Sequence, residues 1–286
     1  MSKPLFGREI KVLIGEVATD SVLIEGFRMS FSIRKTDTKD PNTCELNIWN
    51  LNSNTRSKLE KLDDFAFVSA GYTQADNVET IFVGNITNVV TRYESPEIVT
   101  TISIADGEKV LNSKKVSVSY AKGSTALQVL KDLVAKLDIP LKGSLEKLGI
   151  NKVFNTGYSY TGHVKTAIRK VSEYSGLDWS IQNGEIKFTL EDKDDGSKLV
   201  SINSDSGMIG NPEKTQIKNN KRKSKVKLDG YKIRSLLQPS VEPQGRVEVS
   251  SFVTGPEKIF KIIDVEHNAD NFEGGFETTL TVVEAA

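Results

Sequence analysis

The sequence predicts a mainly β protein with α+β character, in which two β-barrel or sandwich domains flank a small α/β domain. Short apolar–polar alternations broken by turn residues fill residues 8–120 and return from about residue 199. Two amphipathic helices and a hairpin lie between them. At 286 residues the chain is long enough for more than one core. We therefore expect domains at residues 1–120, 121–198 and 199–286.

The first region has the pattern of half-buried strands. Apolar side chains alternate with polar ones along two runs, formed by Phe27, Met29, Phe31 and Ile33 and then by Cys44, Leu46 and Ile48. Further strands are expected at 10–14, 22–24, 65–72, 80–91 and 97–105, with one short helix at 52–62. Many short strands interrupted by a single helix indicate a barrel or a sandwich.

The middle region begins with two helices. The first spans 123–137, is capped by Ser124, and carries an apolar stripe of Leu127, Leu130, Val134 and Leu137. The second spans 161–176, with Thr161 as its predicted cap and Gly176 in the left-handed conformation at its end. Its apolar stripe consists of Val164, Ala167, Ile168, Val171 and Tyr174.

A hairpin follows the second helix, because Asn183-Gly184 favours a type I′ turn between two strands. This turn sets the predicted cross-strand pairs Gln182–Glu185, Ile181–Ile186, Ser180–Lys187 and Trp179–Phe188. Every apolar pair then lies on one face and every polar pair on the other. We expect Trp179 and Phe188 to pack against the second helix.

The last region is β again, with strands expected at 231–237, 246–252, 259–266 and 276–283. It also holds a basic segment, 211–229, which contains Lys214, Lys218, Lys221, Arg222, Lys223, Lys225 and Lys227. We expect this segment to be extended or poorly ordered and solvated. An acidic protein partner and nucleic acid are the alternatives, although the segment has no aromatic residue on which bases could stack.

Composition excludes several classes of protein. Thirty-eight basic residues balance 38 acidic ones, which argues against a dedicated nucleic-acid or membrane-surface binder but not against a local patch. No apolar run has the length of a signal peptide or of a membrane span, so we expect folding in a reducing cytoplasm. The single cysteine, Cys44, excludes an intrachain disulfide and is expected to be buried.

No motif predicts catalysis, so we assign no catalytic, cofactor-binding or metal-binding residue. His163 lies in the first turn of a helix and His267 at an expected surface turn, far apart in the sequence. The acidic run of Glu191, Asp192, Asp194 and Asp195 lacks the ligand spacing of a calcium loop and is interpreted as a solvated turn. The segment 207–210 is too short for a dinucleotide-binding loop. Carboxylates brought together by the fold remain an alternative.

Stretches along nearly the whole chain resemble one protein family. They are Phe31–Thr36, Pro41-Asn42, Ile48–Leu51, Ile81–Ile86, Ser206–Pro212, Ser235–Pro239 with Gly245, and Phe260–His267. The chain resembles the baseplate hub proteins of contractile-tailed phages and related injection machines, the group that includes the late control protein D family. The middle helix and hairpin are similar to the small α/β domain of that family.

The resemblance implies a structural protein without cofactors, located in the virion tail baseplate and assembled in the host cytoplasm. It implies a homotrimeric ring that adapts a sixfold tail tube to a threefold central spike, with the tube protein, the spike and the tape measure as partners. It implies that both β domains are tail-tube-like. From the composition we expect no membrane segment and no specific nucleic-acid binding. A tail-tip cell-wall hydrolase and a peptidoglycan-binding module are the alternatives.

Overall fold

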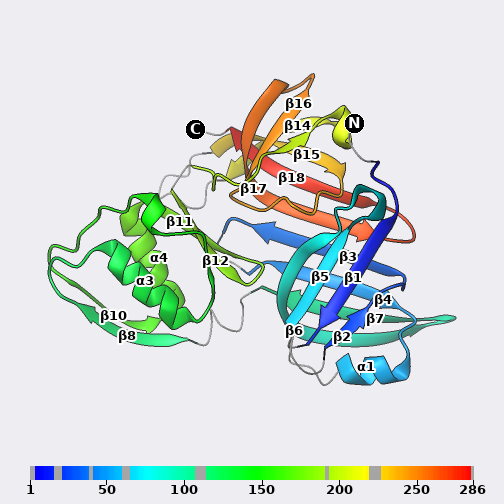
Figure 1. The fold of residues 1–286 in the computed structure, drawn as a ribbon, viewed down its shortest axis with the longest axis horizontal. Helices are drawn as coiled ribbons and strands as arrows, with labels where there is room; N and C mark the ends of the chain where they lie inside the picture. Colours follow the sequence, from blue (N-terminus) through cyan, green and yellow to red (C-terminus); the bar gives the residue numbers. More distant parts are fainter. Residues whose placement is uncertain are drawn as a thin grey trace.

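A computed structural model describes residues 4–15, 21–38, 41–59, 65–106, 114–190, 193–218 and 227–284 of the chain. Strands dominate it, and most of them join one sheet of 13 strands (Figure 1). The predicted mainly β class is confirmed. We call residues 4–106 the N-terminal unit, 114–190 the middle unit and 193–284 the C-terminal unit, because each contains most of one hydrophobic core.

The N-terminal unit is an antiparallel sheet in the order β3-β4-β7-β6-β5-β1-β2. Its core consists of side chains that alternate along the strands, for example Met29, Phe31 and Ile33 on β3, because alternate residues of a strand point to one face. The elements are β1 (Arg8–Ile14), β2 (Val22–Ile24), β3 (Met29–Thr36), β4 (Thr43–Trp49), α1 (Ser53–Leu59), β5 (Phe65–Tyr72), β6 (Glu79–Glu94) and β7 (Glu97–Ala105).

The C-terminal unit has the sheet order β14-β15-β18-β17-β16-β13. Its core includes Phe260 of β17, whose ring lies edge-on to Tyr231 at 5.5 Å between centroids. The elements are β13 (Val200–Ile202), β14 (Met208–Lys218), β15 (Lys227–Leu236), β16 (Arg246–Ser251), β17 (Gly255–Asp270) and β18 (Phe276–Glu284).

The two β units repeat one topology that the sequence did not reveal. In each, a hairpin (β3-β4 or β14-β15) is followed by a three-stranded meander (β5-β6-β7 or β16-β17-β18), and the last strand of the meander pairs with the second strand of the hairpin. The central strands β6 and β17 are both 16 residues long. Each carries register irregularities at matching places, at Ile86/Asn88 in one ladder and Ile262/Asp264 in the other.

The two units join at a seam where the second half of β17 pairs with β3, from Asp264↔Thr36 to Asp270↔Ser30. Because β3 pairs with β17, it does not close the N-terminal sheet on itself. Among the described strands neither unit is a closed barrel, and the sheet is open from β14 at one end to β2 at the other.

The middle unit packs α3 (Ala126–Leu137) and α4 (Val164–Ser175) between two small sheets, one of β8 (Lys115–Tyr120) and β10 (Tyr158–His163) and one of β9 (Leu141–Lys142), β11 (Leu177–Gln182) and β12 (Glu185–Leu190) (Figure 1). All four predicted hairpin pairs are confirmed. Trp179 and Phe188 are buried in the same core as the stripe of α4, as expected.

Local details of this unit differ from the predictions. Thr161 lies in β10 opposite Ser117, so α4 starts only at Val164 with His163 at its N-cap. Thr125, instead of Ser124, caps α3, because it forms a reciprocal capping box with Gln128. The strand β8 was predicted with residues 1–120, but its only strand partner in the described chain is β10, which places it in the middle unit.

Candidate functional site: a buried polar junction

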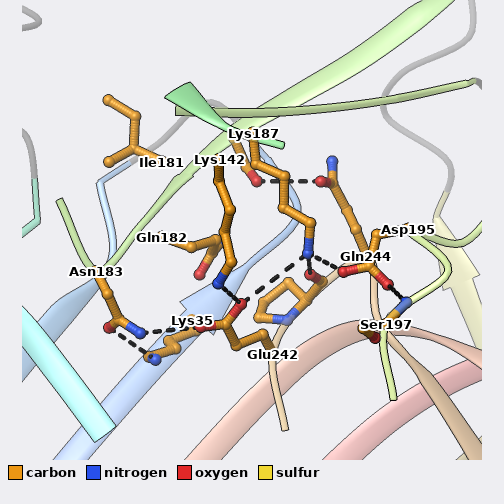
Figure 2. A network of polar contacts seen from close by, with 12 residues as sticks. Lys35, Lys142, Ile181, Gln182, Asn183, Lys187, Asp195, Ser197, Glu242 and Gln244 are labelled. Atoms are coloured by element: carbon orange, nitrogen blue, oxygen red, sulfur yellow. Dashed lines mark hydrogen bonds and ion pairs between the residues drawn. The ribbon is translucent and has the colours of Figure 1, made fainter. Parts of the chain in front are cut away.

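The polar face of the β11-β12 hairpin is buried between the two β units, although the alternation alone suggested a solvated face. Ser180 and Gln182 are fully buried and Lys187 is 4% exposed. We call the contacts of this face the polar junction (Figure 2). It comprises Lys35, Asn42, Asp106, Lys142, Ser180, Gln182, Asn183, Gly184, Lys187, Asp195, Glu242 and Gln244.

The turn of the hairpin is held by the end of β7. Asn183 and Gly184 have φ angles of 55° and 80°, as a type I′ turn requires. This turn directs the amide of Gly184 to Asp106, which accepts at 2.9 Å on Oδ1. Burial raises the pKa of the Asp106 carboxyl to about 6, although the backbone amides of Gly184 and Asn183 and the charge of Lys35 oppose that shift. The protonated form is therefore accessible in mildly acidic solution.

Asn42 fixes the strand that enters the turn. Its Nδ2 donates to the carbonyl of Ile181 at 2.8 Å and to Oε1 of Gln182 at 3.0 Å. Gln182 in turn donates to the carbonyl of Thr36 at 2.9 Å. Because these side-chain amides are buried and paired in both directions, they define the position of the hairpin against β3.

Lys35 reaches the junction from β3, where it is only 1% exposed. Its Nζ donates to Oδ1 of Asn183 at 3.0 Å. Burial lowers the pKa of Lys35, while the nearby carboxylates Glu242 and Asp106 oppose that shift. An ammonium group in this position requires those acceptors, because an uncompensated buried charge is costly.

Glu242 is the acceptor contributed by the C-terminal unit. Its Oε1 accepts from Nδ2 of Asn183 at 3.0 Å and its Oε2 from Nζ of Lys142 at 2.7 Å. Burial alone would raise the pKa of this carboxyl, but the positive charges of Lys35, Lys142 and Lys187 outweigh burial and lower it. Glu242 is therefore ionised and bridges the middle unit to the C-terminal unit (Figure 2).

Lys187 and Asp195 form a close ion pair on the same polar face, farther from the turn, with side chains that are 5% and 10% exposed. The pKa of Asp195 is lowered, because the charge of Lys187 and a hydrogen bond from Ser197 outweigh the effect of burial. Ser180 donates to Oε1 of Gln244 at 3.3 Å. These buried hydrogen bonds and ion pairs favour one orientation of the middle unit, although Nε2 of Gln244 and Oδ2 of Asp106 are buried without a hydrogen-bond partner among the described residues.

A polar cleft of about 550 Å³ borders the junction, and Lys142, Asp195 and Glu242 are among the residues that line it. Both carboxylates are ion-paired with lysines and both have lowered pKa values. A general acid needs a proton near neutral pH, so this pair does not have the properties of a glycosidase dyad.

Of the residues considered in the sequence, His163 lies in the middle unit, whereas Cys44 and His267 lie on β4 and β17, on either side of Ile33 in β3. His163 is exposed at the start of α4, and Cys44 is buried in β4, where burial raises the pKa of its thiol. His267 was expected at a surface turn, and that prediction is wrong. It is fully buried in β17, with Nδ1 2.9 Å from Oγ1 of Thr278, because β3 and β18 cover it on both sides.

Some of the other sequence features lie in described elements, and the rest lie outside the described residues. Asp195 is in the junction instead of a solvated turn, whereas Asp194 accepts from the amide of Gly196 in a local turn. Gly207 ends the 3-10 turn Ser204–Ser206, and Gly210 lies in β14, in the irregular stretch between Ile209 and Glu213. The basic segment continues β14 and β15 at its two ends, and the stretch 219–226, with Glu191 and Asp192, lies outside the described residues.

Within the described ranges, no three His, Cys, Asp or Glu side chains are grouped as a metal site would require. No helix in the same ranges is long and apolar enough to cross a membrane. The sequence did not indicate the junction, because a polar strand face is normally solvated. The available signal was Lys187, a charged residue in a short hairpin flanked by apolar neighbours.

The fold is that of phage tail proteins. The tail protein from Neisseria meningitidis MC58 matches with a TM-score of 0.65 at 11% identity, over 98% of this chain and 97% of that one. The 43 kDa tail protein of prophage MuSo2 from Shewanella oneidensis matches with 0.64 at 9% identity, over 96% and 97%. The E. coli c3393 protein, a component of the type VI secretion system, matches with 0.57 at 12% identity, over 96% and 77%.

Sequence similarity identifies the family. The profile of the baseplate hub gp41 family matches residues 9–251, which is most of the chain. The chain therefore belongs to this family and is a baseplate hub, a structural protein of a phage tail or of a related injection machine. The resemblance found in the sequence is confirmed. A comparison with curated proteins found no match.

Proposed function

We propose that three copies of this chain form a ring that adapts the sixfold tail tube to the threefold central spike. The observation that supports this proposal is the repeated topology of the N-terminal and C-terminal units. Three copies of two like units provide six similar positions around a ring, while the chain as a whole repeats only three times. One face of such a ring matches a sixfold partner and the other a threefold one.

The polar junction has a defined role in this ring. The middle unit contacts both β units through buried, paired polar groups, which permit one orientation only. It is therefore held beside the seam and does not interrupt the sheet, as the order of the strands requires. We propose that the middle unit provides a fixed surface for spike or baseplate partners.

We further propose that the chain is not an enzyme, and that the tube protein, the spike and the tape measure are its partners in the virion tail. We also propose that the hub assembles in the cytoplasm of the host cell. The domain limits that we propose follow the three cores, with β8 in the middle unit, so that the first boundary lies before Lys115.

Cryo-electron microscopy of the assembled particle tests the ring directly. We expect threefold symmetry at the hub, with the two β units alternating at about 60° intervals around the axis. A hub with another symmetry, or β units at different distances from the axis, would overturn the proposal.

The hydrolase and the peptidoglycan-binding module are tested separately on purified cell walls. We expect no fall in turbidity when the chain is added and no retention of the chain by sedimented walls. A fall in turbidity that Glu242→Gln abolishes would establish a hydrolase at the cleft beside the junction.

A further inference from the structure

The repeated topology gives five strands of each β unit a counterpart in the other. The counterparts are β3 with β14, β4 with β15, β5 with β16, β6 with β17 and β7 with β18. The seam inside the chain pairs the long strand β17 of the C-terminal unit with the edge strand β3 of the N-terminal unit. Among the described strands, their counterparts β6 and β14 are not paired with each other.

Both β14 and the second half of β6 have a side that pairs with no described strand. On β17, one side is shared by two strands, β16 over the first half and β3 over the second. On β6, the corresponding side pairs with β5 as far as Asn85, and no described strand pairs with it from there to Glu94. The strand β14 is the last of the sheet, beyond β15. Natural proteins cover strand edges of this length, because they promote association.

We propose that β14 of one copy pairs antiparallel with the second half of β6 of a second copy, as β3 pairs with β17 within each chain. The inference deepens the ring proposed above and rests on it. The two edges belong to different units of the chain. A contact between two different surfaces is heterologous, and it closes into a ring when the rotation permits.

The matching irregularities fix the register of this contact. The shift at Ile262/Asp264 in β17 corresponds to that at Ile86/Asn88 in β6, so Asn88 takes the place of Asp264. Following the ladders through β4 and β15 places Thr215 at the position of Arg34. The seam pairs Asp264↔Thr36 to Asn268↔Ser32 then predict the intermolecular pairs Asn88↔Ile217, Val89↔Gln216, Val90↔Thr215, Thr91↔Lys214 and Arg92↔Glu213.

The side chains are compatible with this register. Arg92 and Glu213 are directly opposite each other, and opposite charges at such positions favour the pairing. The seam inside the chain has the same feature, because Arg34 is opposite Glu266. Thr91 pairs with the buried Thr100 as His267 pairs with Thr278, so the equivalent positions also agree on the next strand.

The β6-β7 hairpin is accessible to a second copy. It projects from the sheet beside α1, and Tyr93 near its tip is 76% exposed (Figure 1). An exposed aromatic residue beside an open edge is typical of an interface position. Among the described strands β14 pairs with β15 alone, and it lies at the opposite end of the β region from β6 (Figure 1).

Disulfide cross-linking of the full chain tests the register. The variants Arg92→Cys/Glu213→Cys and Thr91→Cys/Lys214→Cys place cysteines at two adjacent predicted pairs, one of each hydrogen-bonding type, with Cα atoms within disulfide range. The matched control, Arg92→Cys/Ile217→Cys, is about 13 Å out of register. Cys44 is buried and provides an unreactive background.

After mild oxidation over a range of protein concentrations, we expect at least one in-register variant to give disulfide-linked dimers and trimers on a denaturing gel, and the control to remain monomeric. Mass photometry of the unoxidised chain reports ring formation independently. Trimers without in-register cross-links, or equal cross-linking of the control, would overturn the seam but leave the ring intact. An absence of both trimers and cross-links would overturn the seam and the ring together.

Discussion

The N-terminal and C-terminal units have one topology and two different environments. In the C-terminal unit, the second half of β17 is covered by β3, and His267 is fully buried against Thr278. In the N-terminal unit, the equivalent half of β6 has an open side, and the equivalent pair is Thr91 with Thr100 at 3.4 Å. The two units therefore share the same strand pairing, but their residues at equivalent positions differ according to whether a neighbouring strand covers them.

The same comparison explains Lys35. It lies opposite Val265 in the covered seam, where Oδ1 of Asn183 accepts from its Nζ and the carboxylates of Glu242 and Asp106 lie near its charge. Its counterpart on β14 is Gln216, a neutral residue at the end of the sheet. The buried charge of Lys35 thus lies on the side of the sheet where the polar junction supplies hydrogen-bond acceptors and carboxylates.

The largest expected loss of stability comes from truncating a buried aromatic side chain in the core of either β unit. Phe260→Ala and Phe82→Ala each remove a fully buried ring, and we expect each to lower the free energy of unfolding by about 3–5 kcal/mol. Because the seam joins the two sheets, Phe260→Ala should also lower the denaturant midpoint reported by Trp49 of β4. Urea titration followed by fluorescence, in a Trp179→Phe background, measures this. An unchanged Trp49 transition would mean that the two units unfold independently.

A second effect of similar size separates the junction from the seam. Lys187→Met leaves Asp195 buried without its partner, and we expect a loss of about 3–5 kcal/mol in the stability of the middle unit, reported by Trp179. Asp195→Leu in the same chain should recover most of that loss. The control Lys142→Met removes a more exposed lysine and should cost less than about 1 kcal/mol. Equal losses in both variants would show that burial does not control the junction.

A smaller effect is the acid sensitivity of the covered seam. Burial, with the charge of Lys35, lowers the pKa of His267 well below its usual value near 6.5. The unfolded chain then binds a proton that the folded chain does not, so stability from His267 is complete above about pH 6.5 and falls as the pH decreases. Asp106 acts in the opposite direction, since its pKa is raised to about 6.

The variant His267→Gln isolates this contribution. Relative to it, the unmodified chain should lose up to about 1.4 kcal/mol per pH unit below pH 6.5, as one proton requires. Urea titrations at pH 7.5, 6.5 and 5.5 measure the difference between the two chains, and the Asp106 contribution cancels. Parallel pH profiles for both chains would show that His267 does not titrate differently on folding.

The smallest effect tests the charge pair of the seam. Arg34 and Glu266 are directly opposite on β3 and β17, and cross-strand pairs of this kind contribute about 0.2–1 kcal/mol. Glu266→Lys should therefore lower stability slightly, and adding Arg34→Glu should restore it. A double variant no more stable than the single one would remove the argument from charge at the seam.

The sequence by itself determined the local elements. The Asn183-Gly184 turn and the alternation around it were sufficient for all four hairpin pairs, because a two-residue loop permits only one register. Four of the five residues predicted for the stripe of α4 are buried, whereas Tyr174 is 43% exposed. These four and the end of the helix at Gly176 followed from spacing and from glycine's tolerance of positive φ. The mainly β class followed from strands with period two.

Only the tertiary structure decided how these elements meet. The alternation showed that the hairpin has a polar face, but not that Asp106, Asn42 and Glu242, distant in the sequence, would bury it. The repeat of the two β units was not visible as sequence identity, because strand order depends on backbone pairing that many side chains allow. The burial of His267 and Lys35 could not be predicted for a similar reason. Their burial depends on which strand of another unit lies beside them, and residue patterns record the period of a strand but not its neighbour.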